Sequence, residues 1–355
     1  MIFGKKAHIV GLDIGSSTLK AGEVVETGKG QSLKSFGVIT IPSGAIEEGN
    51  VRDPDVVADA IKKLFKENGI KEQNVAISIG GLSVIVKKIN IATMEENELQ
   101  ETINLEAEQY IPFDISDVNL DFQILGESEH NPNQMSVLLV AAKKETITDY
   151  IDLVNLAGLN PCVIDVDGFA LQNNYEMNYE TAEEENVALI DIGASKTSLN
   201  ILKGDSSVFM RDVSLGCGQI NEKIMSMADC TSEEAEEIKF SEQSDKIAPE
   251  DLREIISSVV ASWTSEIRRA LDFFYSTYPD DHIERILLSG GGGNIEEFRH
   301  LLADETSAEV ETINPFGFLS IDSERFEASY LERVAPQAAI CMGLAIRKVD
   351  DKCMI

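Results

Sequence analysis

The sequence has few of the features that mark secreted, zinc-binding or membrane-embedded proteins. Its five cysteines are scattered, odd in number and never paired as C-x-x-C, so neither a disulfide framework nor a zinc site is predicted. No apolar run approaches the ~20 residues that span a bilayer, and strand-like sequence follows the N-terminus too soon to leave room for a signal peptide. We therefore expect a cytoplasmic protein.

Basic residues are scarce. The chain carries 30 lysines and arginines against 62 aspartates and glutamates, a formal net charge of −32. Such a surface repels nucleic-acid phosphates and anionic lipids. We expect no nucleic-acid binding, and contact with a membrane only through protein partners. The acidic excess is explained either by a solvated surface or by a basic partner protein.

Common hydrolase signatures are also missing. The four histidines show no metal-ligand spacing, and the chain has no G-x-S-x-G elbow and no Ser-His-Asp arrangement. No glycine-rich stretch is followed by the Gly-Lys-Ser/Thr of a P-loop.

What the sequence does contain is one motif written twice. "VGLDIGSSTLKAG" begins at Val10, and "LIDIGASKTSLNI" begins at Leu189. In each, a strand ends in Asp-Ile-Gly, and glycine permits a tight turn whose backbone N–H groups can face an anion. The aspartates, Asp13 and Asp191, could hold Mg²⁺ against phosphate oxygens. The small residues after them are Gly15, Ser16, Ser17, Gly193, Ala194 and Ser195.

A third glycine-rich turn lies late in the chain, in "ILLSGGGGNIEEF". A buried strand leads into Gly290, Gly291, Gly292 and Gly293, and a helix is predicted to follow. Backbone without side chains there would let a flat base or ribose lie against the turn.

The 355 residues suit two lobes of an α/β fold. We place one lobe at 1–180 plus 335–355 and the other at 186–334, separated by the acidic run "ETAEEEN". Each lobe opens with three strands. Within the first lobe, about 83–161 reads as an inserted β-α-β-β-α subdomain, in which two helices cover a small sheet.

The two D-x-G turns and the late glycine turn, in this order, resemble the phosphate-1, phosphate-2 and adenosine motifs of the actin, sugar-kinase and heat-shock ATPase superfamily. That resemblance implies a two-lobed, ribonuclease H-like fold that binds ATP and Mg²⁺. The inserted segment stands where the cell-division protein FtsA and PilM-type pilus proteins carry their 1C subdomain. "INLEAEQYIPFD", 103–114, and "VIDVDGFALQNNY" resemble PilM signatures, and the chain is identified as a member of the PilM-type family.

The resemblance implies roles for the motif residues. Asp13 and Asp191 would position Mg²⁺, and the small residues beside them would hold the phosphates. Gly290 to Gly293 would complete the adenosine pocket.

Three further assignments keep an alternative. Lys20 would reach phosphate or be a surface lysine. Asp167, placed in the loop before a helix, would orient the attacking water or cap that helix. Glu236 and Lys239, one turn apart on a helix, would reach the ribose and base or form an ordinary ion pair.

The resemblance implies an adaptor peripheral to the inner membrane. It would bind ATP, hydrolyse it slowly or not at all, and grip the N-terminal cytoplasmic segment of PilN in a groove between the first lobe's main sheet and the inserted subdomain. Other pilus motor or platform proteins would also contact it. One alternative is an FtsA-like filament protein, which would need a C-terminal amphipathic helix where this chain ends in "VDDKCMI". The other is a small-molecule kinase with Asp167 as base.

Overall fold

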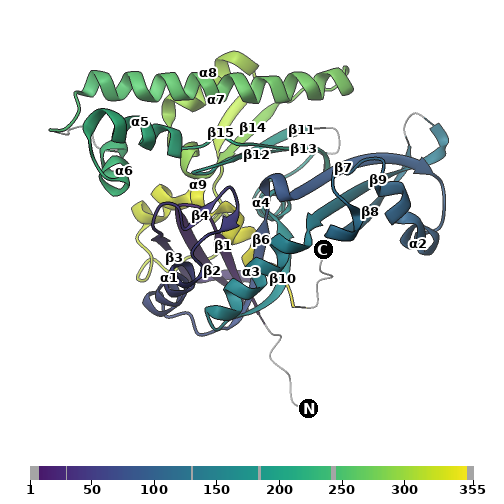
Figure 1. Cartoon of the computed structure of the whole chain (residues 1–355), viewed down its shortest axis with the longest axis horizontal. Helices are drawn as coiled ribbons and strands as arrows, with labels where there is room; N and C mark the ends of the chain where they lie inside the picture. The colour runs from purple at the N-terminus through teal and green to yellow at the C-terminus, as the bar shows by residue number, and fades with distance from the viewer. Residues whose placement is uncertain (1–7, 29, 129–130, 183–184, 241–244, 350–355) are drawn as a thin grey trace, which may run out of the picture.

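The computed structural model describes residues 8–28, 30–128, 131–182, 185–240 and 245–349 (Figure 1). Two five-stranded sheets dominate it, with one three-stranded and one two-stranded sheet beside them. The strands are β1 (Val10–Ile14), β2 (Thr18–Thr27), β3 (Gly30–Thr40), β4 (Ile46–Glu47), β5 (Asn50–Val51), β6 (Asn74–Ile79), β7 (Val84–Ala92), β8 (Val118–Ser128), β9 (Asn131–Lys143), β10 (Asn160–Val166), β11 (Asn186–Ile192), β12 (Thr197–Lys203), β13 (Ser206–Val213), β14 (Arg285–Ser289) and β15 (Glu309–Thr312).

The α-helices are α1 (Pro54–Glu67), α2 (Glu96–Ala107), α3 (Lys144–Leu156), α4 (Asp167–Asn178), α5 (Gly218–Ala228), α6 (Ser232–Phe240), α7 (Pro249–Thr277), α8 (Glu296–Thr306) and α9 (Ala328–Ala345). Three short 3₁₀ helices are η1 (Gly81–Ser83), η2 (Ile115–Asp117) and η3 (Gly291–Asn294). The start of α1 follows from local chemistry, because the Asp53 side chain accepts a hydrogen bond from the Val56 N–H and Pro54 occupies the first turn.

The two large sheets share one topology. Their strand orders are β3-β2-β1-β6-β10 and β13-β12-β11-β14-β15. In each sheet, the first three strands pair in antiparallel order. The fourth strand of the sheet pairs in parallel with the first, and the fifth pairs in parallel with the fourth. The predicted three-strand opening of both lobes is therefore confirmed, and the repetition extends to five strands.

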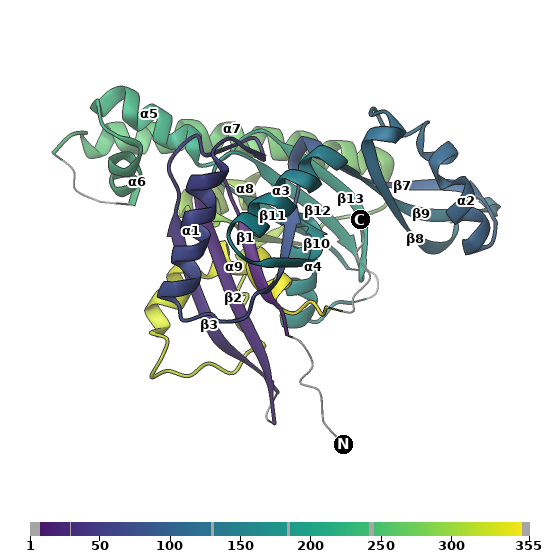
Figure 2. The same ribbon diagram turned by 60° about the horizontal axis from the view of Figure 1, so that its bottom comes forward.

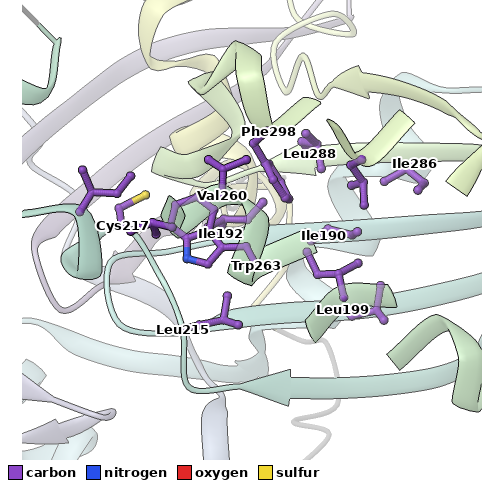
Figure 3. Close-up of a cluster of buried hydrophobic side chains, with 14 of the residues drawn as sticks. Ile190, Ile192, Leu199, Leu215, Cys217, Val260, Trp263, Ile286, Leu288 and Phe298 are labelled. Atoms are coloured by element: carbon purple, nitrogen blue, oxygen red, sulfur yellow. The ribbon is translucent and has the colours of Figure 1, made fainter. Parts of the chain in front are cut away.

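Helices and sheets alternate in layers. A cluster of apolar side chains joins α1 and α3 to one face of the first sheet, and α4 and α9 lie between the two sheets. The outer face of the second sheet is covered by α5, α7 and α8 (Figures 1 and 2). Trp263 of α7 is fully buried in that last cluster beside Leu288 and Phe298 (Figure 3).

The inserted subdomain projects to one side of the molecule in both views (Figures 1 and 2). Its sheet has the order β7-β9-β8 and packs on α2 through Leu99, Ile103 and Ala107. The prediction that a second helix covers this sheet is wrong. Tyr150, Leu153 and other apolar residues of α3 pack with α1 and the first large sheet, so the insertion spans 84–143 instead of 83–161.

The end of the second lobe also differs from its predicted boundary at 334. Phe316, Leu319 and Leu331 pack against β2 and β3 of the first sheet, and Ser320 exchanges backbone hydrogen bonds with Gln31 and Leu33. The chain thus returns to the first lobe before α9 begins, because these apolar side chains find their partners there.

No helix in the described part of the chain is long and apolar enough to cross a membrane. Residues 350–355, to which the expectation about a C-terminal amphipathic helix applies, lie outside the described residues.

Candidate functional site

The two D-x-G turns meet between the lobes. Each is a tight hairpin closed by a glycine N–H: Gly15 donates to the Thr18 carbonyl at 3.2 Å, and Gly193 donates to the Lys196 carbonyl at 2.9 Å. The hydroxyl oxygens of Ser16 and Ser195, one from each turn, are 2.9 Å apart. The structure therefore brings together two motifs that the sequence places far apart.

Asp13 and Lys20 face each other across the β1–β2 hairpin. They are register partners, and the Lys20 Nζ lies 2.9 Å from the Asp13 Oδ2, with both side chains largely buried. Burial raises the pKa of Asp13 although the Lys20 charge opposes this. Burial alone would lower the pKa of Lys20, but the carboxylate beside it raises that pKa. Lys20 is thus a cation inside the site and not a surface lysine.

Asp191 occupies the matching position on β11. Its neighbour in β14 is Ser289, whose hydroxyl donates a 2.7 Å hydrogen bond to the Asp191 carboxylate. Burial raises the pKa of Asp191 to about 6, and the nearby Asp13 charge pushes it in the same direction. The charge of Asp13 thus reaches Asp191 across the cleft.

Asp167 enters the site from the first lobe. It is the first residue of α4 and makes no capping bond, so its predicted place in a preceding loop and its alternative role as helix cap are both wrong. Its Oδ1 accepts a 2.5 Å hydrogen bond from the Ser78 hydroxyl, and its Oδ2 lies 2.5 Å from the Lys196 Nζ. Burial would raise the pKa of Asp167, but the Lys196 charge and these hydrogen bonds lower it.

Glu236 and Lys239 lie on one face of α6, as predicted. The Lys239 Nζ is 2.6 Å from the Glu236 Oε2, and the Asn221 amide of α5 donates to the same oxygen at 2.6 Å. Lys239 is largely buried whereas Glu236 is partly exposed. A polar cluster therefore stands at the second-lobe side of the cleft.

The four glycines of the late turn divide into two pairs. Gly290 has a φ of +77°, and a Cβ there would stand 2.3 Å from the Ile192 carbonyl oxygen, so only glycine fits. Gly290 and Gly291 line the cleft. Gly292 and Gly293 are buried behind it, where a Cβ on Gly292 would overlap the Ile192 side chain. Gly292 and Gly293 thus serve close packing here, and their contact with an adenosine stays a prediction.

One cavity of about 140 Å³ joins these elements. Of the predicted site residues it is lined by Asp13, Gly15, Ser16, Ser17, Lys20, Asp167, Asp191, Gly193, Ala194, Ser195, Glu236, Lys239, Gly290 and Gly291. The volume is below the ~300 Å³ at which small-molecule pockets usually begin.

Sequence reasoning missed several residues that line this cavity or bond to its carboxylates. Lys196 stands inside the second D-x-G turn itself, and the motif spacing could have singled it out. Ser289 directly precedes the four glycines, so the sequence could also have placed it near the site. Ser78 and Asn221 carry no local signal, because their roles depend on strand pairing and helix packing.

The two lobes share one topology, and a D-x-G turn from each faces a common cleft. This arrangement defines the actin-like ATPase fold. The structure of the ethanolamine utilization protein EutJ from Carboxydothermus hydrogenoformans shares it, with a TM-score of 0.57 at 13% identity over 95% of this chain and 89% of that one.

The family to which the chain belongs is narrower than this fold. Residues 11–349 match the family described as "Type IV pilus assembly protein PilM", and the chain belongs to that family. A chain in the structure of the PilM-PilN type IV pilus biogenesis complex is similar with a TM-score of 0.85 and 31% identity, over 98% of this chain and 100% of that chain. The cell division protein FtsA of Bacillus subtilis (strain 168) is 26% identical over 261 residues. The match covers 65% of this chain and spans 57% of the length of FtsA.

Proposed function

We propose that this protein is an ATP-binding adaptor of the type IV pilus assembly machinery, which binds Mg-ATP between its lobes and a segment of PilN on its surface. The observation that carries the proposal is the full-length similarity, 31% identical, to a chain of the PilM-PilN complex. Family membership favours this function over the filament protein and the small-molecule kinase.

The side chains and backbone N–H groups of the cleft support the proposal that it binds a nucleotide. The N–H groups of the two hairpins, together with the Ser16 and Ser195 hydroxyls, can donate to phosphate oxygens. Lys20 supplies a buried positive charge beside them. Glu236, Lys239, Gly290 and Gly291 line the same cavity. The first two would contact the ribose, and the two glycines would leave room for the base.

The carboxylates suit Mg²⁺ held together with phosphates. No group of three or more His, Cys, Asp or Glu side chains among the described residues could hold a metal by itself. Burial and the Asp13 charge both raise the pKa of Asp191, and a divalent cation beside the two carboxylates would relieve that repulsion. Mg²⁺ typically uses one or two carboxylates, retained waters and substrate phosphates. Bound there, it would neutralise phosphate charge.

Thermal denaturation tests the nucleotide site. Mg-ATP at about 100 times its dissociation constant should stabilise the wild type by about 2.7 kcal/mol. Asp13→Asn and Lys20→Met should lose most of that stabilisation, whereas Lys62→Met, which removes an exposed lysine on α1, should keep it. A wild type that ATP does not stabilise would refute the nucleotide proposal.

The partner surface is proposed on the inserted subdomain. Exposed carboxylates surround α2, and Leu105 on the same helix is 66% exposed. The exposed glutamates are Glu95, Glu96, Glu98, Glu101 and Glu108. Cytoplasmic flanks of membrane helices carry an excess of Lys and Arg, so a short basic segment with an apolar side chain would complement this face. Such a contact would place the protein at the inner membrane.

Peptide binding tests this surface. A fluorescent peptide with the N-terminal cytoplasmic sequence of PilN should bind at tens of micromolar or tighter. Glu98→Lys with Glu101→Lys should weaken it at least tenfold, whereas Glu250→Lys with Glu254→Lys on α7, equally exposed, should not. If the wild type does not bind the peptide, the adaptor proposal is refuted. If both double variants lose the same affinity for the peptide, α2 is not the binding surface.

A further inference from the structure

Lys196 forms an ion pair across the two lobes with Asp167, the first residue of α4. It belongs to the second-lobe turn, and its Nζ lies 2.5 Å from the Asp167 Oδ2 and 3.9 Å from the Asp212 Oδ2. Asp167 belongs to the first lobe. This ion pair is largely shielded from solvent, with the Lys196 side chain 29% and the Asp167 side chain 14% exposed, so water screens it less than a surface pair.

Both oxygens of Asp167 are already engaged. Ser78 donates to Oδ1 and Lys196 to Oδ2, and charge-assisted bonds of this kind hold a carboxylate strongly. A general base needs an available lone pair and a pKa near the working pH. These two bonds take up part of the accepting capacity of the Asp167 carboxylate. Burial alone would raise its pKa, but the Lys196 charge and the two hydrogen bonds lower it, so Asp167 accepts a proton less readily.

The surroundings keep Lys196 in place. Asp212 of β13 accepts a 2.5 Å hydrogen bond from the Gly81 N–H of the first lobe, which forms a second link between the lobes beside the ion pair. A Cβ on Gly80 would stand 2.3 Å from the Lys196 Nζ, so the first-lobe backbone closes tightly over the ammonium group. Lys196 is thus packed against the first lobe on two sides.

We propose that Lys196 is a positioning residue that restrains Asp167, so that the protein retains bound ATP instead of hydrolysing it. This inference rests on the proposed nucleotide function. In the restrained reaction, a water oxygen would bond to the γ-phosphorus while the bond from that phosphorus to the β–γ bridging oxygen breaks, giving ADP and phosphate. The proton of the water would pass to Asp167, and the ion pair disfavours that transfer.

The first test measures single-turnover hydrolysis of protein-bound ATP, with ATP binding measured separately by calorimetry. Lys196→Met should raise the hydrolysis rate at least about tenfold, because a freed general base contributes roughly 10²-fold or more. Lys196→Arg, which keeps the charge, should restore the slow rate. Lys196→Met combined with Asp167→Asn should also be slow. Lys203→Met, which removes the lysine of the Lys203–Asp281 pair within the second lobe, should leave hydrolysis unchanged.

The second test needs no nucleotide. In urea denaturation of the nucleotide-free protein, Lys196→Met and Asp167→Asn should each lower the unfolding midpoint. The double variant should lower it by less than the sum of the two, because the residues act as a pair. Additive effects would contradict the restraint.

The remaining outcomes are distinct. A Lys196→Met protein that binds ATP but hydrolyses it no faster than wild type would overturn the inference. So would loss of ATP binding in Lys196→Met alone, since the lysine would then be a phosphate ligand. A wild type that binds no ATP would instead refute the proposed function on which the inference rests.

Discussion

Gly343 of α9 lies so close to Ala170 of α4 that a Cβ atom at position 343 would stand 1.7 Å from the Ala170 carbonyl oxygen. The two helices run between the two large sheets, so this contact sets the spacing of the layers there. A glycine inside a helix normally costs ~1 kcal/mol relative to alanine. Here close approach of the backbones outweighs that cost.

We therefore expect Gly343→Ala to lower the free energy of unfolding by about 2 kcal/mol or more, because backbone must shift to admit the methyl group. Gly28→Ala, where no atom lies within 4 Å of the added Cβ, is the matched control and should change stability little. Urea denaturation followed by circular dichroism measures both. Stabilisation by Gly343→Ala would show that helix propensity decides and that the packing argument is wrong.

Asp191→Asn should stabilise the protein in the absence of ligand. The folded state raises the pKa of Asp191 from 3.8 to about 6, so folding loses stability as the pH rises between these values and the full penalty remains above them. Removing the charge should therefore raise the free energy of unfolding by about 3 kcal/mol at pH 8. The amide oxygen can still accept the Ser289 bond. The gain should shrink at pH 5 and vanish near pH 4.

Thermal melts at these pH values test this, with Asp152→Asn on the exposed face of α3 as the control. The same Asp191→Asn variant should lose stabilisation by Mg-ATP, since it removes a carboxylate proposed to hold the metal. A gain that does not depend on pH would contradict the electrostatic explanation.

Trp263 should contribute more to stability than any exposed aromatic residue. It is 0% exposed, contacts Phe298 edge to face, and donates its indole N–H to the Gln219 side chain at 2.8 Å. Trp263→Ala should cost about 3–5 kcal/mol, and Trp263→Phe less, because it keeps most of the packing but leaves Gln219 unpaired. Phe273→Ala, at a side chain 57% exposed, should cost under ~1 kcal/mol. Equal losses for Trp263→Ala and Phe273→Ala would contradict this ranking.

The inserted subdomain should be separable from the nucleotide cleft. Leu99 is 0% exposed in a core that α2 shares with the three-stranded sheet, so Leu99→Ala should cost about 2–5 kcal/mol locally. Hydrogen exchange should accelerate within 84–143 while Mg-ATP still stabilises the rest. Leu105→Ala, at an exposed position on the same helix, should leave hydrogen exchange unchanged and weaken only the binding of the PilN peptide. Loss of ATP stabilisation in Leu99→Ala would show that the two parts unfold together.

Much of the fold follows from local pattern. The strand-like sequence around the two D-x-G turns predicted both three-strand openings, and the Asp53 cap with Pro54 at the first turn accounts for the start of α1. These features depend on neighbours in sequence, so composition and spacing suffice for them. The same holds for the D-x-G motifs themselves, because glycine and aspartate have defined uses in a turn.

Long-range contacts decided the rest. The packing of α3 against α1, and the return of the chain to the first lobe at Phe316, depend on which apolar faces meet. The same is true of Asp167, which local sequence placed in a loop and the tertiary structure placed between Ser78 and Lys196. The amino-acid sequence alone indicated the two D-x-G turns and, together with the inserted segment, the family. Only the folded chain decided which lysine faces which carboxylate, since that depends on how two lobes close on each other.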